Sequence, residues 1–175
     1  HGEDIRVECN GPVMTITMDR PDVLNALDPP AHRKLAEAFD RYGADDDLRV
    51  AILTGAGEKA FCVGSDLKVR ADMGGDDMPE TGFGGIAERF DLTKPVIAAV
   101  NGHAIGGGLE MVLACDLAIA VPNAKFGLPE VRVGLAASGG LHRLARQLPM
   151  KHATEIALSG QLFSAEKALE YGLVN

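Results

Sequence analysis

Residues 96–110 read VIAAVNGHAIGGGLE, and this stretch decides the fold class. Val96–Val100 is a short apolar run rich in β-branched residues, which predicts a buried strand. Gly106-Gly107-Gly108 then leads into an apolar segment that predicts a helix from about Leu109 to Ala114. Because strands and helices also alternate elsewhere along the chain, the sequence predicts an α/β domain.

The segments on either side of this stretch extend the alternation. Asn10-Gly11 separates two β-rich runs and is a strong signal for a hairpin. Asp28-Pro29 predicts the start of a helix that ends at Gly43, because Asp is a good N-cap and Pro fits the first turn. The expected strands are Ile5–Cys9, Val13–Met18, Val50–Thr54, Val96–Val100 and Leu117–Ala120. The expected helices are Pro29–Tyr42, Leu109–Ala114, Leu141–Gln147, Met150–Leu158 and Ala165–Tyr171, and Met73–Gly85 is expected to be a mobile loop that forms no core.

The charge and the cysteine pattern argue against several classes of function. Seventeen basic and 25 acidic residues give 175 residues a net charge of −8, which disfavours nucleic acid and anionic membranes as partners. Cys9, Cys62 and Cys115 are widely spaced and form no CxxC pair, so neither a disulfide framework nor a zinc site is expected. A reducing, cytoplasmic location is the simplest expectation.

The stretch from Pro95 to Pro122 is long and apolar, so a membrane span has to be considered. It contains Asn101, Glu110 and Asp116, and such residues are costly inside a bilayer. We therefore expect a buried core and no membrane association.

Two glycine-rich motifs have more than one interpretation. Residues 55–60 (GAGEKA) match a dinucleotide-binding fingerprint, but the non-helical FCVGS follows, so a plain turn fits better. Gly106–Gly108 could serve close packing of a strand on a helix. Equally, the free amides of the first helical turn could bind an anion or a developing oxyanion. The local pattern alone does not separate these two interpretations.

Two glutamates stand in apolar surroundings. Glu110 could be a helix N-terminal carboxylate that the dipole favours, or a general acid or base with a raised pKa. Glu130 follows in FGLPEV, and it could equally be a solvated loop residue.

Five motifs, taken together, resemble the crotonase (enoyl-CoA hydratase/isomerase) superfamily in order and spacing. They are Arg20-Pro21 with Asn25-Ala26-Leu27, residues 61–68 (FCVGSDLK), residues 99–110 (AVNGHAIGGGLE), residues 126–130 (FGLPE), and Gly134 with Ser138-Gly139-Gly140. Within the family, residues 48–68, the Gly-rich loop that follows them and residues 90–95 are most similar to the branch that acts on carnitinyl-CoA. The resemblance implies a spiral of ββα units, with residues 1–175 as a single core domain that lacks the C-terminal trimerisation helices.

The resemblance also implies the site. The amides of Ser65 and Gly107 would form an oxyanion hole for the thioester carbonyl, and Glu110 and Glu130 would be the catalytic acid and base. The residues implied to bind substrate or CoA are Leu24, Asn25, Ala26, Ser65, Asp66, Leu67, Lys68 and Gly107.

The implied activity is a lyase that adds or removes water across the 2,3 double bond of an enoyl-CoA thioester, with crotonobetainyl-CoA and carnitinyl-CoA among the candidate substrates. The resemblance implies no metal and no cofactor besides the coenzyme A of the substrate, and it implies a homotrimer or a dimer of trimers. The alternatives are an enoyl-CoA isomerase, a CoA-thioester hydrolase on the same fold, and a non-catalytic acyl-CoA-binding module.

Overall fold

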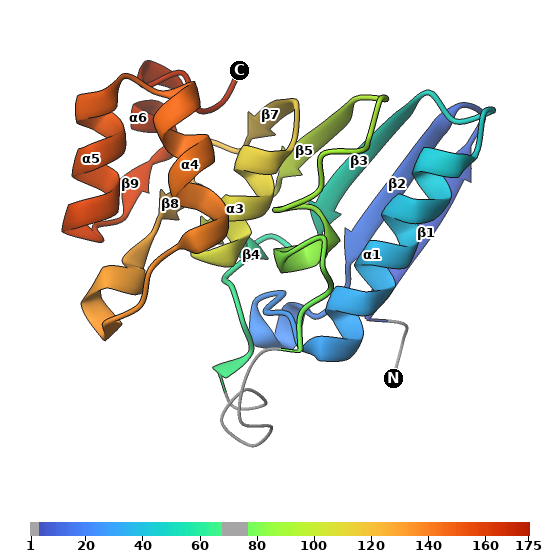
Figure 1. Ribbon diagram of the computed structural model, residues 1–175, viewed down its shortest axis with the longest axis horizontal. Coiled ribbons are helices and arrows are strands. Elements are labelled where there is room, and N and C mark those ends of the chain that lie inside the picture. Colours follow the sequence, from blue (N-terminus) through green and yellow to red (C-terminus); the bar gives the residue numbers. More distant parts are fainter. Residues whose placement is uncertain (1–3, 68–76) are drawn as a thin grey trace.

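The structure, a computed structural model, describes residues 4–67 and 77–175 and contains two β-sheets (Figure 1). The larger sheet has the order β1-β2-β3-β5-β7, with β1 and β2 antiparallel and the other neighbours parallel. Its strands are β1 (Ile5–Asn10), β2 (Val13–Met18), β3 (Val50–Gly55), β5 (Val96–Val100) and β7 (Leu117–Ala120). The smaller sheet has the order β4-β6-β8-β9. Its strands are β4 (Ala60–Cys62), β6 (His103–Ile105), β8 (Lys125–Gly127) and β9 (Phe163–Ser164).

The chain winds between the two sheets in a regular way. The first strand of each successive pair (β3–β4, β5–β6 and β7–β8) joins the larger sheet, and the second joins the smaller one. The helix α3 (Gly107–Ala114) follows the pair β5–β6 directly. This arrangement confirms the predicted ββα spiral. The stretch from Pro95 to Pro122 forms β5, β6, α3 and β7, and no helix in the described part of the chain is long and apolar enough to span a bilayer.

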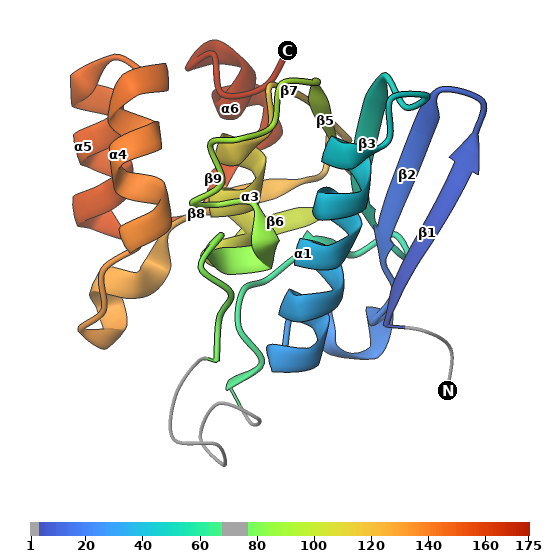
Figure 2. The ribbon, with the colours of Figure 1, turned by 45° about the vertical axis from the view of Figure 1, so that its right-hand side comes forward.

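The helix α1 (Pro29–Ala44) covers one face of the larger sheet (Figure 2). The Asp28 side chain caps it by accepting a hydrogen bond from Ala31 N at 2.9 Å. Leu35, Phe39 and Tyr42 recur along one face of the helix and are fully buried. The helix runs two residues beyond the predicted Tyr42: Gly43 lies within the last turn, Ala44 is the last helical residue, and the N–H of the C-cap residue Asp45 donates to Arg41 O.

The structure confirms the predicted hairpin at Asn10-Gly11 and the predicted plain turn at residues 55–60. Gly11 has a φ of +55° and connects β1 to β2 in the expected register. Residues 56–59 form a bend that leads into β4 and not into a helix, so residues 55–60 lack the helix start that a dinucleotide site requires.

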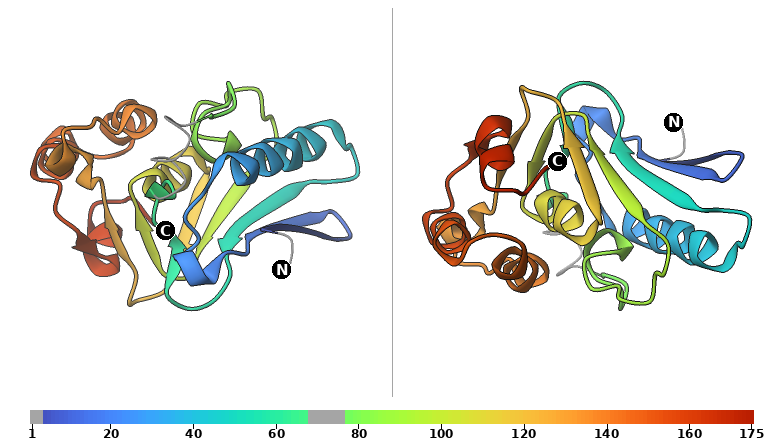
Figure 3. Two further views of the ribbon diagram at one scale, coloured as in Figure 1. Left: turned by 90° about the horizontal axis from the view of Figure 1, so that it is seen from below. Right: turned by 90° about the horizontal axis from the view of Figure 1, so that it is seen from above.

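The prediction of a loop without core from Met73 to Gly85 is wrong at its end, and residues 73–76 lie outside the described part. Phe83–Gly85 forms a 3-10 turn, η2, and all three residues are buried between α1 and α3 (Figure 3). Gly84 and Gly85 have positive φ angles, and a Cβ on either would overlap Met111 or Ala36. Glycine permits both the turn and the close approach. A glycine-rich composition, which is typical of exposed loops, therefore belongs to a buried segment at residues 83–85.

The C-terminal part consists of α4 (Ser138–Gln147), α5 (Met150–Ser159) and α6 (Ala165–Glu170). The helix α4 begins at Ser138, three residues before its predicted start, so that the paired glycines 139 and 140 lie in its first turn. The helices α4 and α5 lie side by side, at the end of the molecule opposite to the β1–β2 hairpin (Figures 1 and 2). A further 3-10 turn, η3 (Pro129–Val133), connects β8 to the segment before α4.

Candidate active site

The glycine-rich turn between β6 and α3 forms one side of the candidate site. Gly106 is the N-cap residue of α3 and has a φ of +59°, which a side chain would strain. A Cβ on Gly107 would overlap the ring of Phe83, and one on Gly108 would overlap the carbonyl oxygen of Cys62. Close packing therefore explains Gly107 and Gly108. Since Gly107 N donates to no acceptor among the described residues, the second interpretation, an anion-binding amide, also remains open.

A second turn brings Ser65 next to this helix start. Gly64 follows β4 with a φ of +99°, and a Cβ on Gly64 would lie 3.5 Å from Gly107 N. Ser65 N, like Gly107 N, has no hydrogen-bond acceptor within the described part of the chain. The two amides predicted to form an oxyanion hole are thus on neighbouring turns and are unpaired, while their convergence on one oxygen atom stays a prediction.

The two segments predicted to bind CoA lie against each other. Leu27 pairs with Ser65 in a parallel bridge, with Leu27 N donating to Gly64 O at 2.9 Å and Asp66 N donating to Leu27 O at 2.8 Å. Arg20 connects the same segments, since its guanidinium lies 2.7 Å from Asp28 and 3.5 Å from Asp66 and also donates to Ala26 O. A cleft lined in part by Pro21, Leu24 and Lys59 opens beside them.

The members of this predicted CoA set differ in what they can offer a ligand. Leu24 and Leu67 are 39% and 71% exposed, whereas Ala26 is buried. Asn25 is fully buried, and its side chain donates to Ala56 O and Ala60 O and accepts from Arg20 N. The Asn25 side chain therefore holds the turn together. Lys68 lies outside the described residues.

Glu110 lies in the first turn of α3 and is only 7% exposed. Its carboxylate faces the start of α4, because a Cβ on Gly139 would lie 3.3 Å from Glu110 Oε2. Burial and the nearby charge of Glu130 raise the pKa of Glu110 to about 7, against an opposing effect of the Gly140 and Gly139 amides. Glu110 Oε1 is buried without a hydrogen-bond partner in the described structure.

Glu130 lies in η3 and approaches the glycine-rich turn from the other side. Its Oε1 is 3.0 Å from the position that a Cβ on Gly106 would take. Burial raises the pKa of this carboxyl, and its Oε2 is also buried without a partner among the described residues. Glu110 and Glu130, twenty residues apart in sequence, are therefore brought together beside Gly107. Their catalytic roles stay predictions.

The raised pKa of Glu110 makes folding stability depend on pH. A carboxyl with a pKa of 4.5 when unfolded and about 7 when folded stabilises the fold below pH 4.5 and loses that contribution as the pH rises through 7. We expect the free energy of unfolding to fall more steeply between about pH 5 and 8 for the wild type than for Glu110→Gln, which cannot titrate. Urea unfolding across this range measures both slopes, and parallel curves would contradict the assignment.

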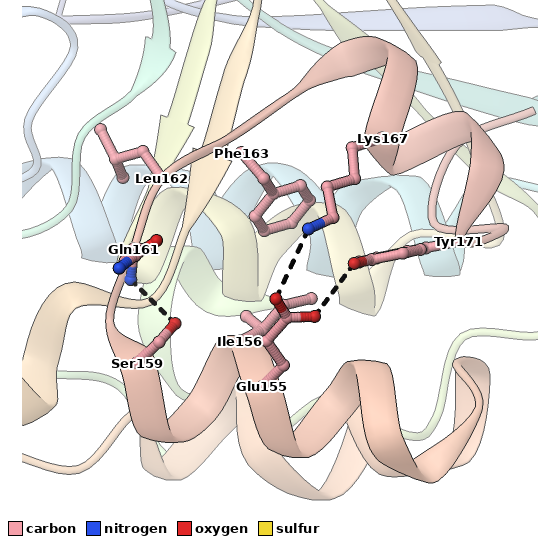
Figure 4. A pocket seen from close by; sticks show the side chains of 8 residues that line it. All are labelled: Glu155, Ile156, Ser159, Gln161, Leu162, Phe163, Lys167 and Tyr171. Carbon is pink, nitrogen blue, oxygen red and sulfur yellow. Dashed lines mark hydrogen bonds and ion pairs between the residues drawn. The ribbon is translucent and has the colours of Figure 1, made fainter.

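Another hollow, between α5, β9 and α6, is a poor candidate (Figure 4). Tyr171 Oη donates to Glu155 Oε2 at 3.0 Å, and Lys167 Nζ lies 3.5 Å from Glu155 Oε1. Its charged groups are already paired with one another, and no residue of the predicted site lines it. Within residues 4–67 and 77–175, no group of three His, Cys, Asp or Glu side chains is placed to hold a metal ion.

Sequence reasoning missed the residues that surround Glu110. Gly139 and Gly140 were part of a motif without an assigned role, and Ala87 lay just beyond the expected loop. The structure places Ala87 Cβ and Glu110 Oε2 each 3.3 Å from the Cβ position of Gly139. A glycine pair at a helix start was the available signal, since it permits such a close approach.

Comparisons with known proteins agree with this geometry. The sequence profile of the enoyl-CoA hydratase/isomerase family matches residues 8–175. A carnitinyl-CoA dehydratase of Salmonella typhi is 46% identical, over 99% of this chain and 67% of its own length. The structure of a carnitinyl-CoA hydratase from Mycobacterium avium superposes with a TM-score of 0.94 at 43% identity, over 100% of this chain and 68% of the other.

An enoyl-CoA hydratase structure from Mycobacterium tuberculosis H37Rv gives a TM-score of 0.92 at 45% identity, covering 98% of this chain and 68% of that one. These relatives confirm the predicted fold and the predicted class of activity. Together with the paired glutamates and the glycine-rich turn, the match over nearly the whole chain shows that this protein belongs to the enoyl-CoA hydratase/isomerase family.

Proposed function

We propose that this chain is a lyase that adds water to, or removes it from, the 2,3 double bond of an enoyl-CoA thioester. One observation carries the proposal: two glutamates with raised pKa values, Glu110 buried and Glu130 half-buried, each with a buried oxygen that has no partner among the described residues, meet beside an unpaired helix-start amide. Hydration needs a proton acceptor for water and a proton donor for the α carbon. Two carboxyls, one protonated and one not, supply both.

The thioester carbonyl would bind at the two turns. Ser65 N and Gly107 N are unpaired among the described residues and lie on adjacent turns, so they can donate to the same carbonyl oxygen. When water attacks C3, negative charge moves onto this oxygen and an enolate forms. Amide donors that are already in place stabilise that charge, and loss of one typically costs about a hundredfold or more in rate.

The positions of the two glutamates suggest their roles. Glu130 Oε1 lies against Gly106, next to the amide that binds the carbonyl oxygen, and is therefore nearer to the α carbon. Glu110 lies deeper, towards α4. In hydration, Glu110 takes a proton from the water that attacks C3, and Glu130 gives its proton to C2 as the enolate collapses. Dehydration runs through the same groups in reverse.

Carnitinyl-CoA and crotonobetainyl-CoA are the proposed substrate pair. The support is the similarity to relatives that include a carnitinyl-CoA dehydratase and a carnitinyl-CoA hydratase. Leu24 and Leu67 would contact the CoA moiety, and Lys59 would place a positive charge in the cleft for its phosphates. The proposal includes no metal and no redox cofactor.

An isomerase or a thioester hydrolase could use the same oxyanion hole. Incubating the full-length protein with a panel of enoyl-CoA thioesters, including crotonyl-CoA and crotonobetainyl-CoA, distinguishes them. We expect 3-hydroxyacyl-CoA products. Migration of the double bond, release of free CoA, or binding without turnover would each overturn the proposal.

We also propose that the protein assembles into trimers and works in the cytoplasm. Several apolar side chains of η3, α5 and the segments beside them are exposed, among them Val133 at 73% and Leu158 at 71%. Such a group of exposed apolar residues is typical of an interface. Light scattering on the full-length protein tests this assembly, and a mass of one chain would contradict it.

A further inference from the structure

One arginine closes the loop of residues 20–28, which carries part of the predicted CoA-binding set. Arg20 O accepts a hydrogen bond from Asn25 N at 2.9 Å, and Arg20 N donates to Asn25 Oδ1 at 3.0 Å. Leu24 and Asn25 have φ angles of +55° and +56°, in the left-handed region that is costly for residues other than glycine. A loop of this kind keeps its shape only where the surrounding structure holds it. The main chain of Arg20 supplies part of that support.

The side chain of Arg20 crosses the loop to its other end. Its Nη1 donates to Ala26 O, and its Nη2 lies 2.7 Å from Asp28 Oδ2 and 3.5 Å from Asp66 Oδ2. Asp28 is itself fixed, because its Oδ1 accepts from Ala31 N as the cap of α1. The Arg20 side chain is only 13% exposed, so water and salt screen these ion pairs less than they screen surface pairs. The guanidinium therefore joins the start of α1 to the segment that follows β4.

The hydrogen bonds of Leu27, in the same loop, set the direction of the Ser65 amide. Leu27 N donates to Gly64 O at 2.9 Å, and Asp66 N donates to Leu27 O at 2.8 Å. The peptide bond between Gly64 and Ser65 is trans and planar, so the Ser65 N–H points opposite to Gly64 O and away from Leu27. A displacement of Leu27 would therefore turn the Ser65 N–H out of its present direction.

We propose that Arg20 is a positioning residue, which fixes the direction of the Ser65 amide by holding Leu27 in place. This inference rests on the proposed function, in which that amide donates to the thioester carbonyl oxygen. Without the guanidinium, Asp28 and Asp66 would be two neighbouring negative charges that repel each other, and the loop would move away from the segment that follows β4. A lysine replaces only part of this link, since an ammonium is a single point of charge, whereas a guanidinium is a planar fork of donors.

Two measurements separate positioning of the amide from general support of the fold. Infrared spectroscopy of bound butyryl-CoA, isotope-labelled at the thioester carbonyl, reports how strongly the site polarises that carbonyl, and the saturated acyl group prevents turnover. Steady-state hydration of crotonyl-CoA gives kcat and KM. The full-length wild type, Arg20→Gln and Arg20→Lys are compared. Arg6→Gln is the matched control, because Arg6 pairs with Asp19 at the same 2.7 Å but lies on β1, outside the loop.

We expect the wild type to lower the carbonyl stretching frequency of butyryl-CoA on binding, and Arg20→Gln to lose most of that shift. The kcat of Arg20→Gln should fall by about tenfold to a hundredfold, towards the loss expected when one amide donor is removed, while its KM changes little. Arg20→Lys should give an intermediate shift and an intermediate kcat. Arg6→Gln should match the wild type in both measurements.

Arg20 variants that keep the full carbonyl shift and the wild-type kcat would overturn the inference, and so would a raised KM with an unchanged kcat. If Arg20→Gln does not fold, Arg20→Lys decides, because a lower melting temperature with an unchanged carbonyl shift would show a role in stability alone and overturn the inference. These results leave the proposed hydration intact if the wild type hydrates crotonyl-CoA. A wild type that binds butyryl-CoA without shifting its carbonyl band would overturn the inference and the proposed oxyanion hole together.

Discussion

Glu130→Gln and Glu110→Gln are each expected to lower the kcat for hydration of an enoyl-CoA by about two or more orders of magnitude. Glutamine keeps the size of the side chain but cannot hold or release the proton, so the step that each carboxyl performs loses its donor or acceptor. Because neither substitution touches the Ser65 and Gly107 amides, the dissociation constant for a saturated acyl-CoA should change little. Steady-state kinetics and calorimetry on the same preparations measure the two effects separately.

Two comparisons make this result specific. Glu37→Gln on the exposed face of α1 removes the same charge far from the glycine-rich turn and should retain full activity. The double variant should lose little more than the worse single one, because the two carboxyls act in one reaction and their effects are not additive. Undiminished hydration by Glu130→Gln would remove the main reason for choosing a lyase over an isomerase or a hydrolase.

The parts of the fold that sequence predicted well are those whose pattern is local. Val96–Val100 and Leu117–Ala120 were predicted with their observed bounds, because each is a short apolar run between polar residues or turns. The Asp28 cap and the Asn10-Gly11 turn are also local, since each depends on residues within one turn of the chain.

The structural features that sequence reasoning missed depend on residues far away along the chain. Phe83–Gly85 is buried only because Ala36 of α1 and Met111 of α3 lie against its glycines, and nothing near residue 83 indicates this. The same holds for Gly139 and Gly140, which lie against Glu110 although about thirty residues separate them. For Glu110 and Glu130, it was the resemblance to a family that predicted their meeting, since the twenty residues between them only permit it.

The second large effect is expected from Gly108→Ala, which should lower the free energy of unfolding by about 3 kcal/mol. In most helices this change is favourable, because alanine has a higher helix propensity than glycine. At residue 108, however, the new Cβ would overlap the carbonyl oxygen of Cys62, a backbone atom that cannot rotate away. Either α3 or β4 must move.

The same movement should affect catalysis, because β4 leads to Ser65 and α3 begins at Gly107. We expect the kcat of the folded Gly108→Ala protein to fall more than its KM rises, as the two amides lose their common acceptor.

Gly43→Ala is the matched control, since its Cβ would meet only Leu92 Cδ2 at 3.3 Å and should leave the melting temperature nearly unchanged. Thermal unfolding at one fixed protein concentration, with kinetics below the transition, measures both quantities. A Gly108→Ala protein as stable and active as the wild type would show that β4 and α3 do not lie in close contact here, and the oxyanion hole proposed between them would then lose its structural basis.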